Sequence, residues 1–423
     1  MLTQEQNQRL TQVGPGTPMG ELLRRYWHPF AAVGELDERP TKTITLLGEE
    51  LVAFKDASGA YGLIDRYCPH RRVDLSYGIP ERSGLRCVYH GWLFDASGAC
   101  TEQPFEEMVR PGGSFKEKTG VRAYPVQALG GLLFTYMGPE PAPLLPRYDM
   151  LAQTERVWRE LFITQLPCSW LQCQENSVDP VHLEWLHGVF GAHEARLRGH
   201  RDPLAEALTE YGRHKEIGFD RFKRGIIKRR VYGSSTRQDP KWSIGHPLLF
   251  PNVLQGGGGG RYFMQFRVPV DDERTWHVEL TSYWFPDDVD VPAQTSVPHH
   301  HVTLAHPDGR LRGDDTMAQD STAWVLQGPI VDRSREMLGE SDRGLILFRQ
   351  MLEEQMRVVA EGGEPMNLVR DQAENVLIHN DQEGWGRLGH DSDIEEIARY
   401  GSVLRDGIAA ILQGTANQGA HTA

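Results

Sequence analysis

The chain contains the two stretches Tyr67-Cys-Pro-His-Arg-Arg72 and Leu85-Arg-Cys-Val-Tyr-His-Gly-Trp-Leu-Phe-Asp95, and each places one cysteine close to one histidine. A structural zinc site is the ordinary alternative for two cysteines and two histidines, but zinc fingers usually place like ligands together, whereas these alternate. The alternation favours a [2Fe–2S] cluster in which two histidines replace two of the four cysteines, an exchange that raises the reduction potential. We therefore predict that the cluster ligands are Cys68, His70, Cys87 and His90.

These two stretches resemble the cluster-binding loops of Rieske non-haem iron oxygenases. The Rieske proteins of respiratory complexes are a competing interpretation, but their loops carry two further cysteines joined in a disulfide. Val73 and Tyr89 stand at the corresponding positions of this chain, and no apolar anchor segment precedes the motif. The resemblance is therefore to the oxygenases.

A second motif with metal-binding side chains lies in Asn176-Ser-Val-Asp-Pro-Val-His-Leu-Glu-Trp-Leu-His187. It resembles the mononuclear iron motif of the same family, in which an Asp precedes two histidines. That resemblance implies that His182 and His187 bind iron(II) and that a carboxylate from further along the chain completes the site. Two imidazoles and one carboxylate on one face of the iron leave positions open for dioxygen and substrate. The alternative is two unrelated histidines on an amphipathic helix, which the first motif makes the weaker interpretation.

The spacing of the two histidines makes a local prediction. His182 and His187 are five residues apart, so on a regular α-helix they would lie roughly 140° apart around the axis, given about 3.6 residues per turn. They cannot bind one metal ion from an undistorted helix. We therefore expect a π-type widening, or a break helped by Pro180, which lacks a backbone N–H.

In this family the carboxylate ligand comes from a later helix. The segment Met317-Ala-Gln-Asp-Ser-Thr-Ala-Trp-Val-Leu-Gln-Gly-Pro-Ile-Val-Asp-Arg333 resembles that helix in phthalate-dioxygenase-like members. We therefore assign Asp320 as the ligand, with Asp342 as the second choice. The other acids considered are expected to be solvated or to cap helices, and they are Asp314, Asp315 and Asp332.

Asp179 is the principal candidate for a catalytic side chain outside the metal ligands. The resemblance implies that it accepts hydrogen bonds from a metal-binding histidine of its own chain and from a cluster histidine of a neighbouring chain, which orients the imidazole and raises its basicity. Electrons would then pass from His90 to His182 across a trimer or a pair of stacked trimers. A helix cap before Pro180 is a compatible simpler role. Asn176 is a second candidate catalytic residue.

The sequence indicates two domains. Between Thr43 and Phe134, short β-rich runs alternate with Gly, Asp, Ser and Pro, which predicts a small antiparallel β domain. The proline-rich stretch Gly138-Pro-Glu-Pro-Ala-Pro-Leu-Leu-Pro146 is a stiff connector. We therefore place a Rieske domain with a helical lead-in at residues 1–146 and an iron domain at residues 147–423.

The second domain mixes strand and helix patterns. Helical periodicity is expected around residues 176–188, 316–327 and 341–361. Strands are expected at Phe162–Thr164, Gly225–Tyr232, Tyr262–Val268 and His277–Phe285. The predicted fold class is α+β, with an antiparallel sheet flanked by helices in the larger domain.

Composition limits the class of protein. The 423 residues carry a formal net charge of −13, which argues against nucleic acid or an anionic membrane surface as a partner. There is no apolar run of about eighteen residues and no secretory signal pattern, so we expect a cytoplasmic protein. The cysteines outside the cluster motif have no framework spacing and are expected to be reduced, and they are Cys100, Cys168 and Cys173.

The segment Ser341-Asp-Arg-Gly-Leu-Ile-Leu-Phe-Arg349 again resembles the phthalate 4,5-dioxygenase-like branch, so the resemblance spans the chain. It implies the terminal oxygenase, or alpha, component of a multicomponent system. A flavin and iron–sulfur reductase would supply electrons from NAD(P)H, and the mononuclear iron would activate O₂. The expected reaction is cis-dihydroxylation of an aromatic substrate, or its monooxygenation, including demethylation. The alternative is a Rieske electron carrier without oxygenase activity, which leaves the second motif unexplained.

A run of basic residues bears on the substrate. It contains no acidic residue and consists of Arg221, Lys223, Arg224, Lys228, Arg229, Arg230 and Arg237. A carboxylated aromatic substrate requires such a cation, and docking of another subunit or an acidic partner is an equal alternative. Two further stretches are expected to have no catalytic role, namely Gly256–Gly260 as a mobile loop and His299–His301 as a solvated loop.

Overall fold

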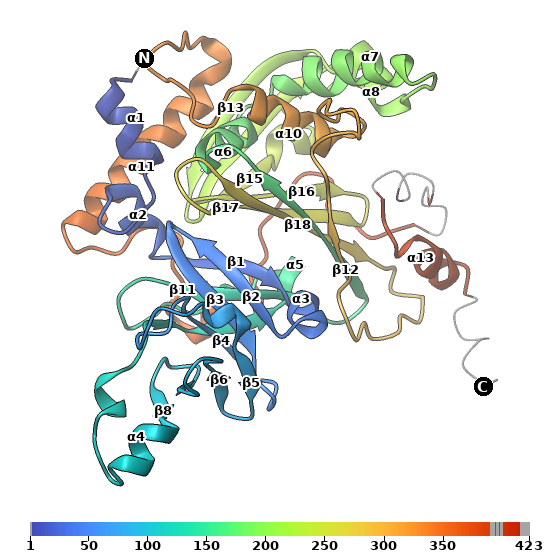
Figure 1. Ribbon diagram of the computed structural model, residues 1–423. Helices are drawn as coiled ribbons and strands as arrows, with labels where there is room; N and C mark the ends of the chain where they lie inside the picture. Colours follow the sequence, from blue (N-terminus) through green and yellow to red (C-terminus); the bar gives the residue numbers. More distant parts are fainter. Residues whose placement is uncertain (1, 390–393, 395–396, 398–400, 415–423) are drawn as a thin grey trace.

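The computed structural model describes residues 2–389, 394, 397 and 401–414. A smaller, mostly β part lies below a larger part that is built around one eight-stranded sheet (Figure 1). The predicted α+β class, with an antiparallel β part followed by a sheet flanked by helices, is confirmed. None of the described helices is both long and apolar enough to cross a bilayer.

The smaller part contains antiparallel sheets with strand orders β1-β11-β10, β2-β3-β4-β9 and β5-β6-β7-β8. Its strands are β1 (Trp27–Ala32), β2 (Thr41–Leu46), β3 (Glu49–Lys55), β4 (Tyr61–Asp65), β5 (Ile79–Glu81), β6 (Gly84–Arg86), β7 (Leu93–Phe94), β8 (Cys100–Glu102), β9 (Ala123–Tyr124), β10 (Val126–Leu129) and β11 (Leu132–Tyr136). A compact core between the second and third sheets contains Phe54, Leu75 and Phe94 together with Cys68 and Cys87. The two thiols therefore belong to the buried core of this part.

The larger sheet has the order β13-β14-β15-β16-β17-β18-β12-β19. Its strands are β12 (Val157–Leu166), β13 (His214–Phe222), β14 (Gly225–Tyr232), β15 (His246–Leu249), β16 (Val253–Gly258), β17 (Arg261–Pro269), β18 (Thr275–Trp284) and β19 (His299–His301). All neighbouring strands are antiparallel except β12 and β19. Every residue of β18 is buried, so both faces of the sheet are covered at its centre.

The helices gather around this sheet and beside the smaller part (Figure 1). They are α1 (Gln4–Thr11), α2 (Pro18–Leu23), α3 (Val33–Glu38), α4 (Pro104–Val109), α5 (Asp149–Ala152), α6 (Trp170–Val178), α7 (Gly191–Leu197), α8 (Pro203–Tyr211), α9 (Pro240–Ser243), α10 (Thr316–Leu326), α11 (Arg343–Ala360) and α13 (Arg405–Leu412). Helix α6 packs on β16 and β17, and α10 and α11 both contact α6. The predicted helices near 316–327 and 341–361 are confirmed as α10 and α11.

Helix α6 is held by a buried cluster of charges. Glu175 accepts hydrogen bonds from Arg333 Nη2 at 2.7 Å and from Arg349 Nε at 2.6 Å. Arg333 also donates to Asn7 of α1 at 3.0 Å, and Arg349 pairs with Glu336 at 2.7 Å. Breaking a buried ion pair of this kind is strongly destabilising, because it leaves an uncompensated charge. Segments far apart in the sequence thus fix the helix that precedes the iron motif.

Two of the loop predictions are wrong. Gly256 and Gly257 lie inside β16, paired with Phe263 and Tyr262 of β17. The glycines permit this close pairing, because a Cβ at Gly256 would lie 2.5 Å from the Phe263 ring and Gly257 has φ +97°. The histidines His299–His301, expected in a solvated loop, form β19 beside β12 because their backbone groups complete the edge of the sheet.

The N-terminal lead-in packs against the larger part as well as the smaller one. Helix α2 contacts α11, and Tyr26 donates from its hydroxyl to the carbonyl of Met366 at 2.8 Å. The proline-rich connector is also held, since Leu144 donates its N–H to Val369 at 2.8 Å. The division at residue 146 stays a prediction.

Candidate functional site

The two cysteine and histidine loops lie side by side at one end of the molecule. Each is a tight turn closed by backbone hydrogen bonds, from Cys68 N to Val73 O at 2.9 Å and from Cys87 N to Trp92 O at 2.8 Å. Gly91 within the second loop has φ +73°, a conformation that glycine adopts without steric cost. The loops follow β4 and β6, so the second and third sheets of the smaller part bring them together.

The side chains of these loops form a buried pair of thiols and an exposed pair of imidazoles. The Cys68 thiol and the Cys87 sulfur are hydrogen-bonded, which lowers the pKa of Cys87 to about 6 with help from the backbone amides of Tyr89 and His90, whereas burial opposes the shift. The rings of His70 and His90 lie 4.3 Å apart between centroids, and both histidines are exposed. A thiolate is the form that binds metal, so the donor set fits an iron–sulfur cluster with its histidine side at the surface.

The iron motif departs from regular helix geometry at the predicted place. Helix α6 ends at Val178, and the segment Leu183–Phe190 (η3) is a π-helix. Asp179 is the C-cap of α6, and its carboxylate accepts the N–H groups of Val181 at 2.7 Å and His182 at 3.2 Å. Both expected devices, a break before Pro180 and a π-type widening, are confirmed.

The π-helix brings three side chains to one point. The metal-binding atoms of His182, His187 and Asp320 all lie within 4.8 Å of one another. Asp320 Oδ1 is 3.3 Å from His187 Nε2 and 3.7 Å from His182 Nε2. This buried oxygen accepts no hydrogen bond within the described part of the chain, as expected of an atom that faces a metal ion. Two imidazoles and one carboxylate with open positions are the ligand set of non-haem iron(II) oxygenases.

The charge state of Asp320 is the one that a metal site requires. Burial raises the pKa of Asp320. The imidazoles of His187 and His182 and the guanidinium of Arg267 lower it by more than burial raises it, so the pKa lies below its usual value. The carboxylate is therefore ionised at neutral pH. His187 is buried and contacts Gln319, whose Oε1 lies 2.9 Å from His187 Nδ1. This contact leaves Nε2 of His187 free to face Asp320.

The other acids considered in the sequence have structural roles. Asp314 pairs with Arg198 at 2.7 Å, and Asp315 caps α10 by accepting the N–H of Ala318 at 2.8 Å. Asp332 closes a turn with Ser334 at 2.6 Å. The second choice for the ligand, Asp342, accepts the N–H of Gly339 at 2.7 Å. Asp320 is thus the member of this set that the fold places beside the two histidines.

The three side chains line a cavity of about 400 Å³, here called the iron cavity. Asn176 and Asp179 also line it, together with apolar residues such as Leu254 and Phe263. The volume lies within the range of small-molecule sites, about 300–1,000 Å³. The iron cavity therefore has room for an organic substrate beside the ligand cluster.

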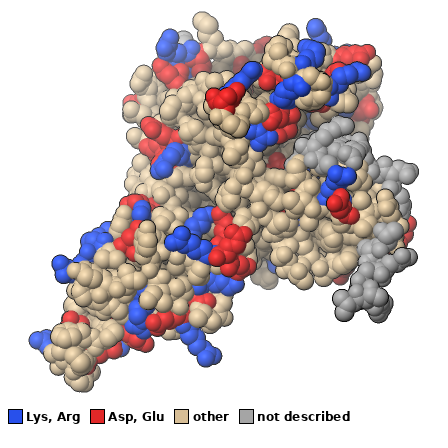
Figure 2. Space-filling view, turned by 45° about the vertical axis from the view of Figure 1, so that its right-hand side comes forward, with Lys and Arg blue, Asp and Glu red and all other residues tan. Residues whose placement is uncertain are grey.

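The basic run divides into paired surface residues and two residues of the cavity wall. Arg221 pairs with Glu354 at 2.7 Å, Lys223 with Glu374 at 2.6 Å and Arg229 with Asp220 at 2.5 Å. Figure 2 shows the same mixing of opposite charges on the face that it draws. Lys228 and Arg230 line the iron cavity instead. The sequence missed this division because Glu354 and Glu374 lie far along the chain and Asp220 meets Arg229 only when β13 pairs with β14.

Comparisons with known proteins agree with this geometry. The family model described as Rieske [2Fe-2S] domain matches residues 26–125. The chain is 44% identical over 379 residues to the 5,5'-dehydrodivanillate O-demethylase oxygenase subunit of Sphingobium sp. (strain NBRC 103272 / SYK-6), covering 89% of this chain and 86% of that protein. It is 43% identical over 360 residues to the 3-chlorobenzoate-3,4-dioxygenase oxygenase subunit of Comamonas testosteroni, covering 81% and 76%.

More distant relatives include the phthalate 4,5-dioxygenase oxygenase subunit of Pseudomonas putida, 30% identical with 83% and 85% coverage. Among solved structures, Pseudomonas putida CBB5 NdmA superposes with a TM-score of 0.60 at 22% identity, covering 84% of this chain and 98% of that one. The match extends over both parts of the molecule and therefore supports the overall fold.

The fold and its two groups of ligands define a Rieske protein with a second metal centre in a larger domain. The chain belongs to the Rieske non-haem iron oxygenases, as an oxygenase subunit of their phthalate 4,5-dioxygenase-like branch. It is therefore an enzyme whose cofactors are a Rieske [2Fe–2S] cluster and a mononuclear iron. A role in electron transfer alone is excluded, because the similarity continues through the larger domain.

Gln319 is a residue of the site to which the sequence analysis gave no role. Its signal was its position directly before Asp320 at the start of a helix. We expect Gln319→Leu to weaken iron binding by about 10–100-fold, because the imidazole loses the partner that orients it. Titration of apoprotein with Fe(II) measures this affinity, and the Rieske signal should be unchanged.

The control for this prediction is Gln327→Leu, a change at the exposed C-cap of the same helix. Gln319→Glu retains an acceptor oxygen and should bind iron better than Gln319→Leu. Wild-type iron affinity in Gln319→Leu would show that the amide does not support His187.

Proposed function

We propose that this oxygenase subunit uses dioxygen, and electrons from NAD(P)H delivered by a flavin and iron–sulfur reductase, to oxygenate an aromatic substrate. The reaction is cis-dihydroxylation, or monooxygenation that includes O- or N-demethylation. The observation that carries the proposal is the convergence of His182, His187 and Asp320 on one wall of the iron cavity. Metal and substrate would meet there without further rearrangement of the chain.

The proposed roles of the residues follow from their positions. Cys68, His70, Cys87 and His90 hold the cluster, and His182, His187 and Asp320 hold the iron. The iron, when bound, supplies the coordination positions at which dioxygen is activated. Asn176 lies on the cavity wall, within reach of a bound substrate. Cytoplasmic location stays a prediction.

Lys228 supports an anionic substrate. Its side chain is buried, with 5% of the residue exposed, and its ammonium donates a hydrogen bond to the carbonyl of Ser177 at 2.8 Å. Among the described residues Lys228 forms no ion pair, although Arg230 beside it is paired with Glu383. The carboxylates of Asp179, Glu383 and Asp320 act on this charge from nearby but form no ion pair with it. A buried charge without a direct ion pair is costly, so a carboxylate on the substrate would stabilise it. Three relatives are named for dehydrodivanillate, chlorobenzoate and phthalate, which are aromatic carboxylates.

The proposed assembly is a head-to-tail ring of three chains, or two stacked rings. The cluster loops lie at the lower end of the molecule in Figure 1, and α6 and α10 lie at the upper end. Exposed apolar side chains accompany both centres, with Tyr89 52% exposed beside His90 and Trp185 64% exposed near His182. Asp179 is 3.4 Å from His182 Nδ1 and only partly buried. Heterologous contacts of this kind close into rings, and in such a ring Asp179 would bridge His182 to a neighbour's His90.

The first test concerns the iron ligands. We expect His182→Ala, His187→Ala and Asp320→Ala to contain about two iron atoms per chain in place of about three, because each variant keeps the cluster and loses the mononuclear iron. Substrate-stimulated O₂ uptake should be lost, and the Rieske signal in electron paramagnetic resonance should persist. Asp342→Ala is the matched control and should retain the third iron. Three irons and full turnover in Asp320→Ala would refute the assignment.

The second test concerns the proposed path of electrons between subunits. Asp179→Asn keeps the helix cap, because Asn caps as well as Asp, but its amide cannot match the charge-assisted hydrogen bonds of the carboxylate. We expect both metal centres and the oligomer to remain and most turnover to be lost. Light scattering and the rate of cluster oxidation measure these properties, with Asp332→Asn as the control. An active monomer, or full activity in Asp179→Asn, would exclude this path.

The third test concerns Lys228. Burial, which is the largest cause, and the nearby Arg230 lower the pKa of Lys228 to about 8, although the carboxylates of Asp179, Glu383 and Asp320 act against this shift. The ammonium is present below that pKa and is lost as the pH rises, so kcat/KM for an aromatic carboxylate should fall above about pH 8. Lys228→Met should raise KM for the carboxylate at neutral pH and abolish this decrease.

The matched substrate for this test is the corresponding neutral amide, which should be little affected by the substitution or by pH. Lys223→Met, a change on the exposed surface, is the control variant. Equal losses for the amide and the carboxylate would mean that Lys228 supports the fold and does not bind the anion.

A further inference from the structure

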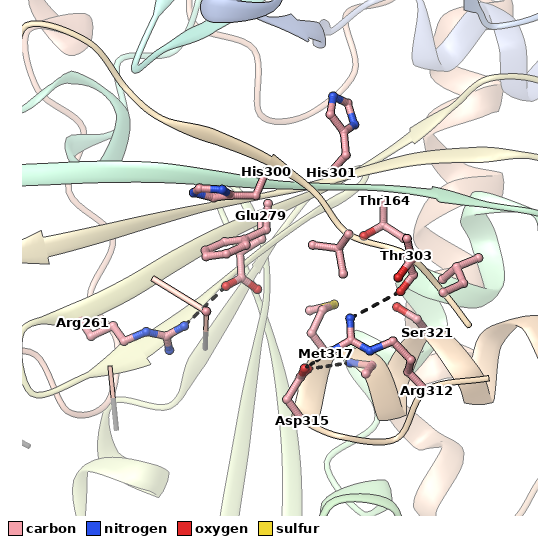
Figure 3. A pocket seen from close by; sticks show the side chains of 15 residues that line it. Thr164, Arg261, Glu279, His300, His301, Thr303, Arg312, Asp315, Met317 and Ser321 are labelled. Carbon is pink, nitrogen blue, oxygen red and sulfur yellow. Dashed lines mark hydrogen bonds and ion pairs between the residues drawn. The ribbon is translucent and has the colours of Figure 1, made fainter. Parts of the chain in front are cut away.

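A second cavity of about 340 Å³ lies directly beside the iron cavity. Figure 3 shows it between the strands that carry Thr164 and Glu279 and the beginning of α10, with His300 of β19 above it. Arg261, Glu279 and Met317 line both cavities. The two spaces are therefore neighbours that share one wall.

The shared wall consists of one ion pair and one flexible side chain. Arg261 Nη2 lies 3.6 Å from Glu279 Oε1. Glu279 is buried and is held by Gln265 Nε2 at 2.7 Å and by the Thr281 hydroxyl at 3.0 Å. Met317 is unbranched and adapts its shape readily. A ligand can therefore extend past Met317 while the charged part of the wall stays in place.

The second cavity presents buried hydroxyl groups. Thr164 and Ser321 are 5% and 4% exposed and both line the space. Figure 3 shows both side chains beside the cavity. A hydroxyl can donate one hydrogen bond and accept others. The two hydroxyls are thus suited to a polar group that enters the cavity.

The rest of the lining combines apolar surface with a fixed cation. Phe162, Leu304 and Ala318 provide apolar contacts. Arg312 is held by Asp314 at 3.0 Å and by the carbonyl of Thr303 at 3.4 Å. This mixture of apolar walls and a few polar groups is typical of a ligand site. It fits a ring that carries oxygen substituents better than it fits a plain hydrocarbon.

We propose that the substrate has two parts, with the reacting ring in the iron cavity and a second, oxygen-bearing ring in the second cavity. This inference rests on the proposed function and specifies its substrate class. The iron cavity alone is large enough for the reacting ring, so a single-ring substrate leaves the second cavity unused. The two buried hydroxyls are then the hydrogen-bonding partners of the second ring.

Binding without turnover tests the proposal. Benzoate serves as the one-ring probe and 4-(4-hydroxyphenoxy)benzoate as the two-ring probe, and calorimetry under exclusion of dioxygen measures both Kd values. Ala318 lines the second cavity and not the iron cavity, so Ala318→Phe should fill the second space alone. We expect the wild type to bind the two-ring probe at least about tenfold more tightly than benzoate, and Ala318→Phe to remove this preference while leaving benzoate within about twofold.

A conservative variant guards against a folding defect. Thr164→Val keeps the volume and removes the hydroxyl, and it should weaken the hydroxylated two-ring probe by about threefold to tenfold without affecting 4-phenoxybenzoate. The Rieske signal and the melting temperature report whether each variant is folded. Equal weakening of both probes in Ala318→Phe, or no preference in the wild type, would overturn the proposal and leave the cavity as a solvent-filled passage.

The proposal and the oxygenase function fail in different ways. Selective binding of the two-ring probe without substrate-stimulated O₂ uptake would contradict the proposed reaction and retain the two-cavity site. Efficient oxygenation of one-ring acids, without any preference for two-ring probes, would support the proposed reaction and contradict the two-cavity site.

Discussion

The site depends on a geometric constraint within one short segment. His182 and His187 are five residues apart, and a regular helix would direct their rings away from each other. The π-helix at Leu183–Phe190 solves this, because its wider turn brings the ring centroids to 5.2 Å. The distortion is supported from outside: Glu184 accepts a hydrogen bond from the His214 ring at 2.8 Å, and Asp179 caps the preceding break. Contacts of this segment with α7, α8 and α10 hold it opposite Asp320.

The two metal centres have opposite relations to solvent. The cluster loops expose their histidines and bury their cysteines. His182, His187 and Asp320 line a cavity, and His187 is 5% exposed there. Between them lies a shared core that contains residues from both parts of the chain, including Leu51, Phe134 and Phe266. One site therefore presents its histidines at the molecular surface, whereas the other faces a cavity of small-molecule size.

The sequence predicted those features that depend on local spacing. The spacing of His182 and His187 predicted the π-type distortion, and periodicity predicted the helices near 316–327 and 341–361. Asp320 was assigned by resemblance to a family helix, and the structure places it beside the two histidines. Pairing between distant segments was not predictable from the same patterns. Gly256 and Gly257 have the composition of a loop, but they form a strand because they pair with β17. His299–His301 form a strand because they pair with the edge of β12. Likewise, the sequence does not distinguish Lys228 from the other basic residues of the run, because its burial depends on the fold.

The buried charge cluster around Glu175 also constrains the order in which the molecule is assembled. The partners of Glu175 lie 158 and 174 residues further along the chain, whereas the core beneath the cluster loops is formed by residues between Val52 and Cys100. Contacts that close long loops form late, and domains synthesised first tend to fold first. During synthesis, the cluster loops can therefore reach their final shape, and receive their iron and sulfide, before the helix that precedes the iron motif has any of its charged partners.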